Sequence, residues 1–87
     1  MNKIAMITGA GSGVGRATAK ALAAQGWSCA LVGRKQDALE ETAKALKGDH
    51  LVAPGDVGDP VQVKAIFARI KDKFGRLDML FNNAGMG

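Results

Sequence analysis

The sequence of 87 residues has few of the features that would tie it to a disulfide framework, a metal or a membrane. It contains one cysteine, Cys29, which rules out an internal disulfide and leaves too few thiolates for a structural zinc site. The apolar run at residues 4–7 stops at a glycine-rich stretch, so it is too short for a signal-peptide core or a membrane span. We therefore expect a cytoplasmic protein without membrane contact.

Basic runs are absent, and so is tyrosine. The chain has 12 Lys and Arg against 8 Asp and Glu, for a net charge of +4, but the basic residues are scattered along it. This distribution favours a small phosphate-bearing ligand over a nucleic acid. Hydrophobic residues make up 47% and charged residues 23%, as in ordinary soluble domains. A chain of this length forms one small domain or part of one.

Short apolar runs alternate with helical patterns along the chain. The runs predict four buried strands, at residues 4–7, 29–32, 51–53 and 77–81. The three segments between them show helical spacing over about 11 to 14 residues each. Their predicted buried positions are Val14, Ala17, Ala21, Leu22 and Ala24 in the first, Leu39, Ala43 and Leu46 in the second, and Val63, Ile66, Phe67 and Ile70 in the third.

Glycine and proline mark the predicted helix ends. Gly26 stands where a left-handed helix cap is favoured, and Gly48 and Gly75 end the other two helices. Asp59 and Pro60 fit an N-cap followed by proline at the first helical position. The resulting βαβαβαβ order predicts an α/β fold with a parallel sheet, helices on its faces and right-handed connections. A ligand is expected beyond the carboxyl ends of the strands.

The first of these strand ends carries alternating glycines, in the sequence TGAGSGVG at residues 8–15. Such a loop lets backbone N–H groups and the helix N-terminus face a diphosphate without side chains in the way. The spacing does not fit G-x-G-x-x-G. It resembles the T-G-x-x-x-G-x-G pattern of short-chain dehydrogenases/reductases, and NNAG at residues 82–85 resembles that family's element after the fourth strand.

The resemblance covers the whole chain and carries several implications. The fold would be a Rossmann-type doubly wound parallel sheet with strand order 3-2-1-4, of which the first βαβαβαβ portion is present. Residues 1–87 would be the N-terminal part of a single NAD(P)-binding domain. The family is an oxidoreductase family that transfers hydride between a nicotinamide cofactor and a carbonyl or alcohol, using a Ser and a Tyr-x-x-x-Lys beyond the fourth strand. Since tyrosine is absent, we expect a truncated chain without catalytic competence of its own, from a protein that forms a homo-oligomer, a dimer or a tetramer.

The resemblance also implies which residues bind the cofactor. The pyrophosphate would lie against residues 13–15, and Asp56 would contact the adenine ring. Asn83 and Ala84 would lie beside the adenosine ribose, and Gly85 would allow close approach of the backbone. Asp56 could instead be only a turn residue, and Asn82 and Asn83 could instead bridge neighbouring strands. The expected cofactor-binding set is Thr8, Gly9, Ser12, Gly13, Val14, Gly15, Gly33, Arg34, Lys35, Asp56, Val57, Asn83, Ala84 and Gly85.

The end of the second strand favours NADP over NAD. Gly33 occupies the place where an acidic residue would bind the ribose hydroxyls of NAD. Arg34 can pair with a phosphate through two hydrogen bonds, and Lys35 follows it. Ser12, however, occupies a position where many NADP-using relatives carry a basic residue, so NAD is the alternative.

The sequence also allows two other functions. An S-adenosylmethionine-dependent methyltransferase has a similar glycine loop, but it prefers acidic residues where this chain has Thr8 and Gly33. A non-catalytic dinucleotide-binding module is the second alternative. We expect His50 to lie on the surface away from the crevice. Arg16, just past the glycine loop, could assist in binding the phosphate of NADP, or it could contact only water, as exposed helical arginines usually do.

Overall fold

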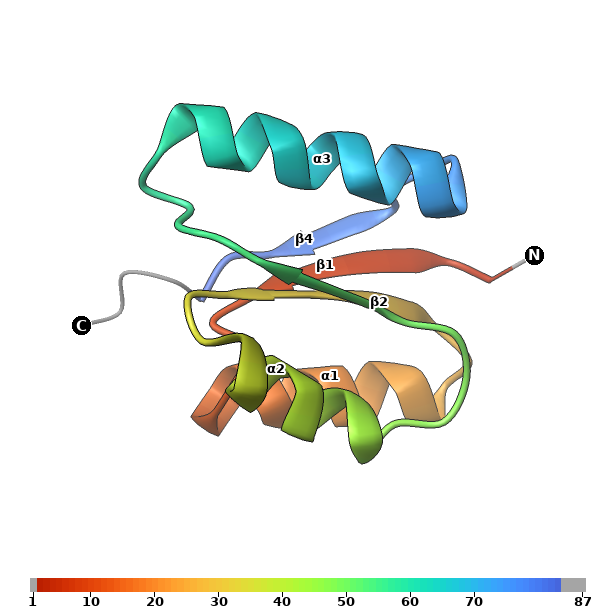
Figure 1. Ribbon diagram of the computed structural model, residues 1–87. Coiled ribbons are helices and arrows are strands. Elements are labelled where there is room, and N and C mark those ends of the chain that lie inside the picture. Colours follow the sequence, from red (N-terminus) through yellow and green to blue (C-terminus); the bar gives the residue numbers. More distant parts are fainter. Residues whose placement is uncertain (1, 84–87) are drawn as a thin grey trace.

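The computed structural model describes residues 2–83, in which strands and helices alternate. The strands are β1 (Ile4–Thr8), β2 (Ser28–Gly33), β3 (Leu51–Pro54) and β4 (Met79–Phe81), and the helices are α1 (Gly13–Ala24), α2 (Gln36–Lys44) and α3 (Pro60–Phe74). The strands form one parallel sheet in the order β3-β2-β1-β4 (Figure 1). Both the α/β architecture and the order 3-2-1-4 are as predicted.

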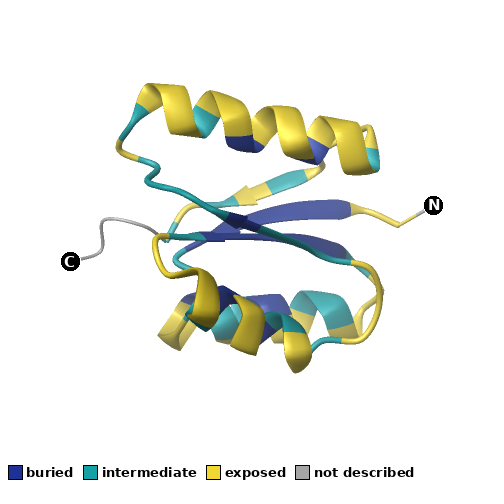
Figure 2. Ribbon diagram, in the orientation of Figure 1, coloured by how far each residue is buried: buried dark blue, intermediate teal, exposed yellow. Residues whose placement is uncertain are grey.

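Helices cover both faces of the sheet, with α1 and α2 on one face and α3 on the other (Figure 1). Since successive strand residues point to opposite faces, β1 sends Ile4 and Met6 into the cluster under α3 and Ile7 into the cluster under α1 and α2. The two central strands are buried almost throughout (Figure 2). This explains why they are continuous apolar runs in the sequence. No helix within residues 2–83 is long and apolar enough to cross a bilayer.

The buried face of α1 differs from the prediction. Its buried residues are Gly15 and Ala19, whereas Val14 is 62% exposed. A Cβ at Gly15 would overlap the carbonyl oxygen of Gly9, so the helix approaches the loop through this glycine. That close approach fixes the rotation of α1 and turns Val14, Ala17, Ala21 and Ala24 outward, while Leu22 is partly buried.

The other two helices depart less from the prediction. α2 ends at Lys44, before the expected Gly48, because the N–H groups of Ala45 and Leu46 bond to carbonyls three residues back and close the last turn. α3 begins as predicted, with Asp59 accepting a hydrogen bond from Val61 N at 3.0 Å, and ends at Gly75 with φ 77°. Its predicted buried stripe holds for Ile66 and Ile70, but Phe67 is 39% exposed.

Polar side chains hold the amino ends of the strands, at the edge opposite the glycine loop. Asp78 joins β4 to β1 by accepting a hydrogen bond from Ile4 N at 2.8 Å, and its own N–H donates to Ile4 O at 2.8 Å.

His50 lies away from the crevice, as predicted. It is partly buried, and its Nδ1 accepts a hydrogen bond from Cys29 N at 3.0 Å. Burial raises the pKa of the Cys29 thiol to about 11, so this cysteine is unreactive at neutral pH.

Candidate functional site

The candidate site lies at the carboxyl ends of the strands, where four segments from separate parts of the chain meet one edge of the sheet (Figure 1). These segments are the loop at 9–15 after β1, residues 33–35 after β2, residues 56–57 after β3 and residues 82–83 after β4. The parallel sheet therefore brings together the predicted cofactor-binding residues that the structure describes. Ala84 and Gly85, also predicted, lie outside the described residues.

The glycine loop adopts backbone conformations that favour glycine at two positions. Gly9 and Gly13 have φ values of 63° and 55°, in the left-handed region that side chains disfavour. A Cβ at Gly9 would lie 2.9 Å from Asn83 Nδ2, so this glycine allows the loop to pack against the end of β4. At Gly13 nothing lies within 4 Å of an added Cβ. The loop is thus tightly packed at one glycine and open at the other.

The N-terminus of α1 faces this open side without a side-chain cap. Ser12 is the N-cap residue, but its side chain makes no capping hydrogen bond within the part of the chain that the structure describes. The first turn also contains no acidic residue. First-turn N–H groups and the helix dipole attract anions, so an uncapped N-terminus fits a phosphate ligand. The residues present therefore fit the diphosphate of a dinucleotide.

Thr8 and the asparagines connect β1 to β4. The Thr8 hydroxyl accepts a hydrogen bond from Asn83 N at 2.7 Å and lies 3.1 Å from Asn82 Oδ1. Thr8 itself is only 2% exposed. The side-chain contact of Asn82 fits the strand-bridging alternative, whereas Asn83 bonds to Thr8 through its main-chain N–H. Both contacts give Thr8 a role in holding the two strand ends together beside the loop.

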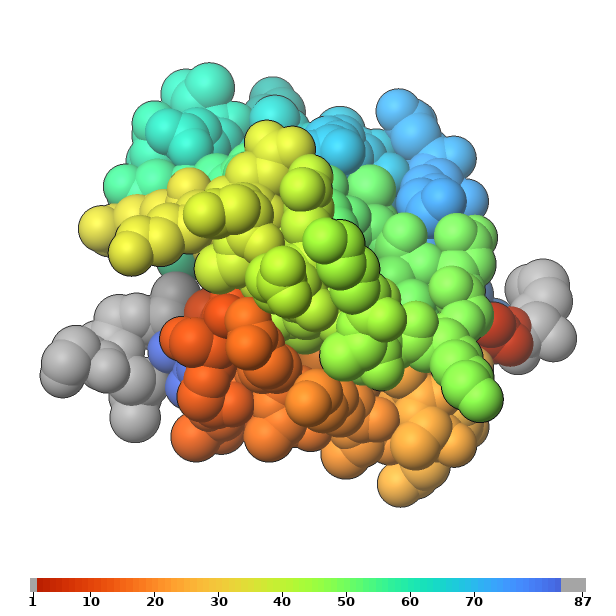
Figure 3. Space-filling view, turned by 60° about the horizontal axis from the view of Figure 1, so that its bottom comes forward, coloured from red at the N-terminus to blue at the C-terminus, as the bar shows by residue number. Residues whose placement is uncertain are grey.

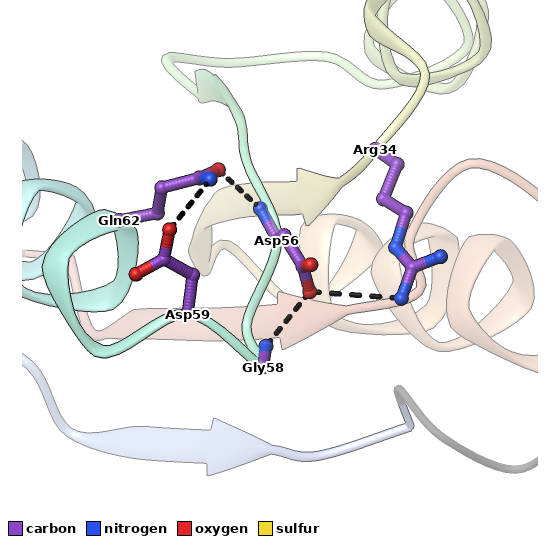
Figure 4. A network of polar contacts seen from close by, with 5 residues as sticks. All are labelled: Arg34, Asp56, Gly58, Asp59 and Gln62. Carbon is purple, nitrogen blue, oxygen red and sulfur yellow. Dashed lines mark hydrogen bonds and ion pairs between the residues drawn. The ribbon is translucent and has the colours of Figure 1, made fainter.

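The ends of β2 and β3 bring two predicted residues of opposite charge together. Arg34 Nη2 lies 3.6 Å from Asp56 Oδ1, with side chains 81% and 41% exposed (Figure 4). Asp56 Oδ1 also accepts a hydrogen bond from Gly58 N at 2.8 Å, as expected of a turn residue. An ion pair this exposed contributes only about 0 to 1 kcal/mol, so a stronger anion can replace Asp56 as the partner of Arg34.

The remaining predicted residues differ in exposure. Lys35 follows Arg34 in the chain as the exposed N-cap residue of α2, and it has no side-chain capping bond among the described residues. Val57 packs against the cluster under α3, which makes its side chain part of the core. Gly33 is partly buried, and a Cβ there would meet Leu39 Cδ2 at 3.2 Å.

Arg16 makes contacts that the sequence did not predict. Instead of contacting only water, its side chain hydrogen-bonds Gly11 O at 2.6 Å, Ala38 O at 3.3 Å and Thr42 Oγ1 at 2.8 Å. It therefore joins the glycine loop to α2. The sequence signal was its position directly after the loop, but its acceptors on α2 become neighbours only in the folded chain.

Comparisons with known proteins agree with this geometry. Residues 3–87 match the family described as short chain dehydrogenase. An uncharacterized oxidoreductase from Staphylococcus haemolyticus is 45% identical over 85 residues, covering 97% of this chain and 37% of that protein. Levodione reductase from Leifsonia aquatica is 40% identical over 90 residues, covering 98% of this chain and 34% of that protein.

A solved structure shows the same fold with its ligands. The crystal structure of L-sorbose reductase from Gluconobacter frateurii, complexed with NADPH and L-sorbose, superposes with a TM-score of 0.94 at 40% identity. The match covers 99% of this chain and 34% of that one. The chain thus spans about a third of the length of these relatives, with 37% and 34% covered in the two sequences and 34% in the structure.

Proposed function

The chain belongs to the short-chain dehydrogenase family, and from this premise we propose that residues 1–87 form the NADP(H)-binding part of an oxidoreductase acting on a carbonyl or alcohol. In this proposal they are the N-terminal part of a single NAD(P)-binding Rossmann domain. Family membership also removes the reason for considering a methyltransferase.

The observation that carries the proposal is the open, uncapped glycine loop. Gly13 has a positive φ with free space before it, and the N-terminus of α1 lacks a capping side chain within residues 2–83. The diphosphate would be held by the N–H groups of residues 13–15. Asp56 would lie beside the adenine and Asn83 beside the adenosine ribose, with Ala84 and Gly85 completing that side.

The end of β2 supports NADP as the cofactor, with NAD as the alternative. Gly33 adds no carboxylate that would repel a 2′-phosphate, and the exposed guanidinium of Arg34 is available to bind one. Lys35 adds a second positive charge. The family relative from Gluconobacter frateurii was solved with NADPH, which supports the same choice.

The chain's own share of the chemistry is binding and orientation. When bound, the nicotinamide supplies the hydride, and the protein positions it and excludes competing reactions. The proton transfer that accompanies reduction requires a general acid, a tyrosine in this family, and the 87 residues contain none. We therefore expect the 87-residue chain to bind NADPH without catalysing carbonyl reduction.

The test places a charge at Gly13. In Gly13→Asp, a carboxylate enters the open side of the loop and repels the diphosphate, while Gly13→Asn is the matched control because both residues tolerate a left-handed backbone. We expect calorimetry to show NADPH binding to the parent chain and to Gly13→Asn, and at least roughly ten-fold weaker binding to Gly13→Asp. A parent chain that binds no dinucleotide, or equal affinities for the two variants, would overturn the proposal.

The proposal also covers the cellular location, the oligomeric state and the substrate of the whole protein. A single buried cysteine suits a cytoplasmic protein, and the family resemblance suits a homo-oligomer, a dimer or a tetramer. The substrate would be a small carbonyl compound or alcohol.

A further inference from the structure

Two side chains hold consecutive carbonyls of the glycine loop from the side of α2. Thr42, which is fully buried, lies with its Oγ1 2.8 Å from Ala10 O, and the guanidinium of Arg16 donates to Gly11 O at 2.6 Å. The same guanidinium donates through Nε to Thr42 Oγ1 at 2.8 Å. α1, α2 and the loop between β1 and α1 therefore share one hydrogen-bonded unit, here called the Arg16–Thr42 clamp.

The direction of each hydrogen bond follows from the chemistry of the two side chains. A guanidinium has only donors, so the Thr42 oxygen accepts from Arg16 and its own hydrogen remains for donation. That hydrogen has two carbonyls in reach, Ala10 O at 2.8 Å and Ala38 O at 3.3 Å, and the shorter contact lies on the glycine loop. The bond to Ala10 O is thus reinforced by the positive charge of Arg16.

The clamp sets the orientation of the peptide units in the loop. In a trans peptide the C=O of one residue and the N–H of the next point in opposite directions. Holding Ala10 O and Gly11 O toward α2 therefore aims the N–H groups of Gly11 and Ser12 away from α2. Neither N–H donates a hydrogen bond to another residue in the range 2–83.

Close packing leaves the loop little freedom to turn otherwise. A Cβ at Gly11 would lie 2.9 Å from Ala38 Cβ, and Ala10 N donates to Val32 O at 3.1 Å. Figure 3 shows the orange atoms of α1 and the loop before it directly against the yellow-green atoms of α2.

We propose that Arg16 and Thr42 are positioning residues. By holding the peptide units of Gly11 and Ser12, they set the course of the loop into residues 13–15, whose N–H groups would bind a dinucleotide diphosphate, and they do not touch the ligand themselves. The inference rests on the proposed function for the identity of its ligand. The hydrogen bonds of the Arg16–Thr42 clamp do not depend on that function, because they are contacts within this chain.

The test compares a probe that contains a diphosphate with one that lacks it. The variants are Arg16→Gln and Thr42→Val, with Thr42→Ser retaining the hydroxyl. Arg69→Gln is the control for Arg16→Gln, because Arg69 donates to Val52 O. Thr18→Val is the control for Thr42→Val, because the Thr18 hydroxyl bonds to Val14 O within α1 and not to Ala10 O or Gly11 O. Calorimetry gives the Kd for NADPH and for adenosine 2′-monophosphate, and thermal unfolding shows which variants fold.

The expected result separates positioning from stability. Arg16→Gln and Thr42→Val should weaken NADPH binding roughly ten-fold, the change expected when a charge-assisted hydrogen bond is lost, and should change adenosine 2′-monophosphate binding less than about two-fold. Thr42→Ser and both controls should bind as the parent does. Unchanged NADPH affinity in the folded variants, or equal losses for both probes, would overturn the inference.

A separate measurement without ligand keeps the clamp testable if the proposed function fails. In that case the parent chain binds neither probe, and the amide resonances of Gly11 and Ser12 decide the question. These resonances should shift in Arg16→Gln and remain in place in Arg69→Gln. Arg16→Gln is chosen because Arg16 is partly exposed, so this variant is less prone to misfold than one at the buried Thr42. Resonances that do not move in Arg16→Gln would show that the clamp does not orient the loop.

Discussion

Arg34 is the residue on which the choice between NADP and NAD depends most. In Arg34→Asp, a carboxylate at the end of β2 would accept hydrogen bonds from ribose hydroxyls and repel a 2′-phosphate. We expect the preference for NADPH over NADH to fall at least roughly ten-fold, measured as the ratio of the two dissociation constants. The variant loses the ion pair between Arg34 and Asp56, but both side chains are exposed, so this loss should change the stability of the fold little.

The control for Arg34→Asp is Lys64→Asp, which makes the same change of charge on the exposed surface of α3. It should leave the NADPH-to-NADH ratio unchanged. If the ratio is the same in Arg34→Asp and in the parent chain, Arg34 does not bind the 2′-phosphate, and NAD becomes the better candidate.

Individual residues were predictable where backbone geometry demands one residue type. Gly9 and Gly13 adopt positive φ values, and few other residues serve there, so the sequence pattern identifies them. Arg16 was not predictable in this way, because its acceptors on α2 lie 22 and 26 residues along the chain. An arginine on a helix reaches such partners only after the helices have packed, and no local pattern records that contact.

At the scale of elements, one carboxylate, that of Asp78, supports the connection of β4 to β1 at the amino ends of the strands. A side-chain hydrogen bond from Arg76 is the main cause that lowers the pKa of Asp78, with a further contribution from the N–H of Ile4. A lowered pKa means that the charged form stabilises the fold above the ordinary pKa of about 3.9 and that this stabilisation is lost as the pH falls through the lower folded value. Asp78→Asn should therefore lower the melting temperature at pH 7.

The difference in melting temperature between Asp78→Asn and the parent should shrink as the pH falls below about 4, because the parent carboxyl then becomes protonated as well. Asp72→Asn, on the exposed surface of α3, is the matched control and should follow the parent at every pH. A difference that stays constant with pH would show that the charge of Asp78 does not stabilise the junction.

The elements themselves were predicted correctly in type and order, while one helix face was not. The strands are apolar runs too short for helices and are bounded by glycine, proline or polar residues, and this combination of length and flanking residues indicates buried strands. In α1, alanine occurs on both faces, buried at Ala19 and exposed at Ala17 and Ala21, so hydrophobic spacing could not distinguish the faces. The close approach of Gly15 to Gly9 O decides the rotation, and it depends on the loop rather than on the helix.

At the scale of the whole molecule, several exposed apolar side chains lie on or near β4, the strand at one edge of the sheet. β4 is an edge strand, and Leu80 pairs in register with Met6, so its side chain points to the face covered by α3. There Leu80 is 51% exposed, and Phe67 and Leu77 line a hollow of about 280 Å³ beside α3 and are 39% and 36% exposed. An edge strand beside exposed apolar side chains favours pairing with another chain.

We therefore expect the 87-residue chain to self-associate as its concentration rises, through β4 and the exposed residues beside it. Sedimentation velocity over a range of concentrations measures this association. The double variant Phe67→Gln/Leu80→Gln should remain monomeric to higher concentration, because it removes the apolar surface without altering the buried clusters. Val61→Gln is the control, since Val61 is 77% exposed in the first turn of α3, and it should associate as the parent does. A parent chain that stays monomeric at high concentration would show that this surface does not pair with a second copy.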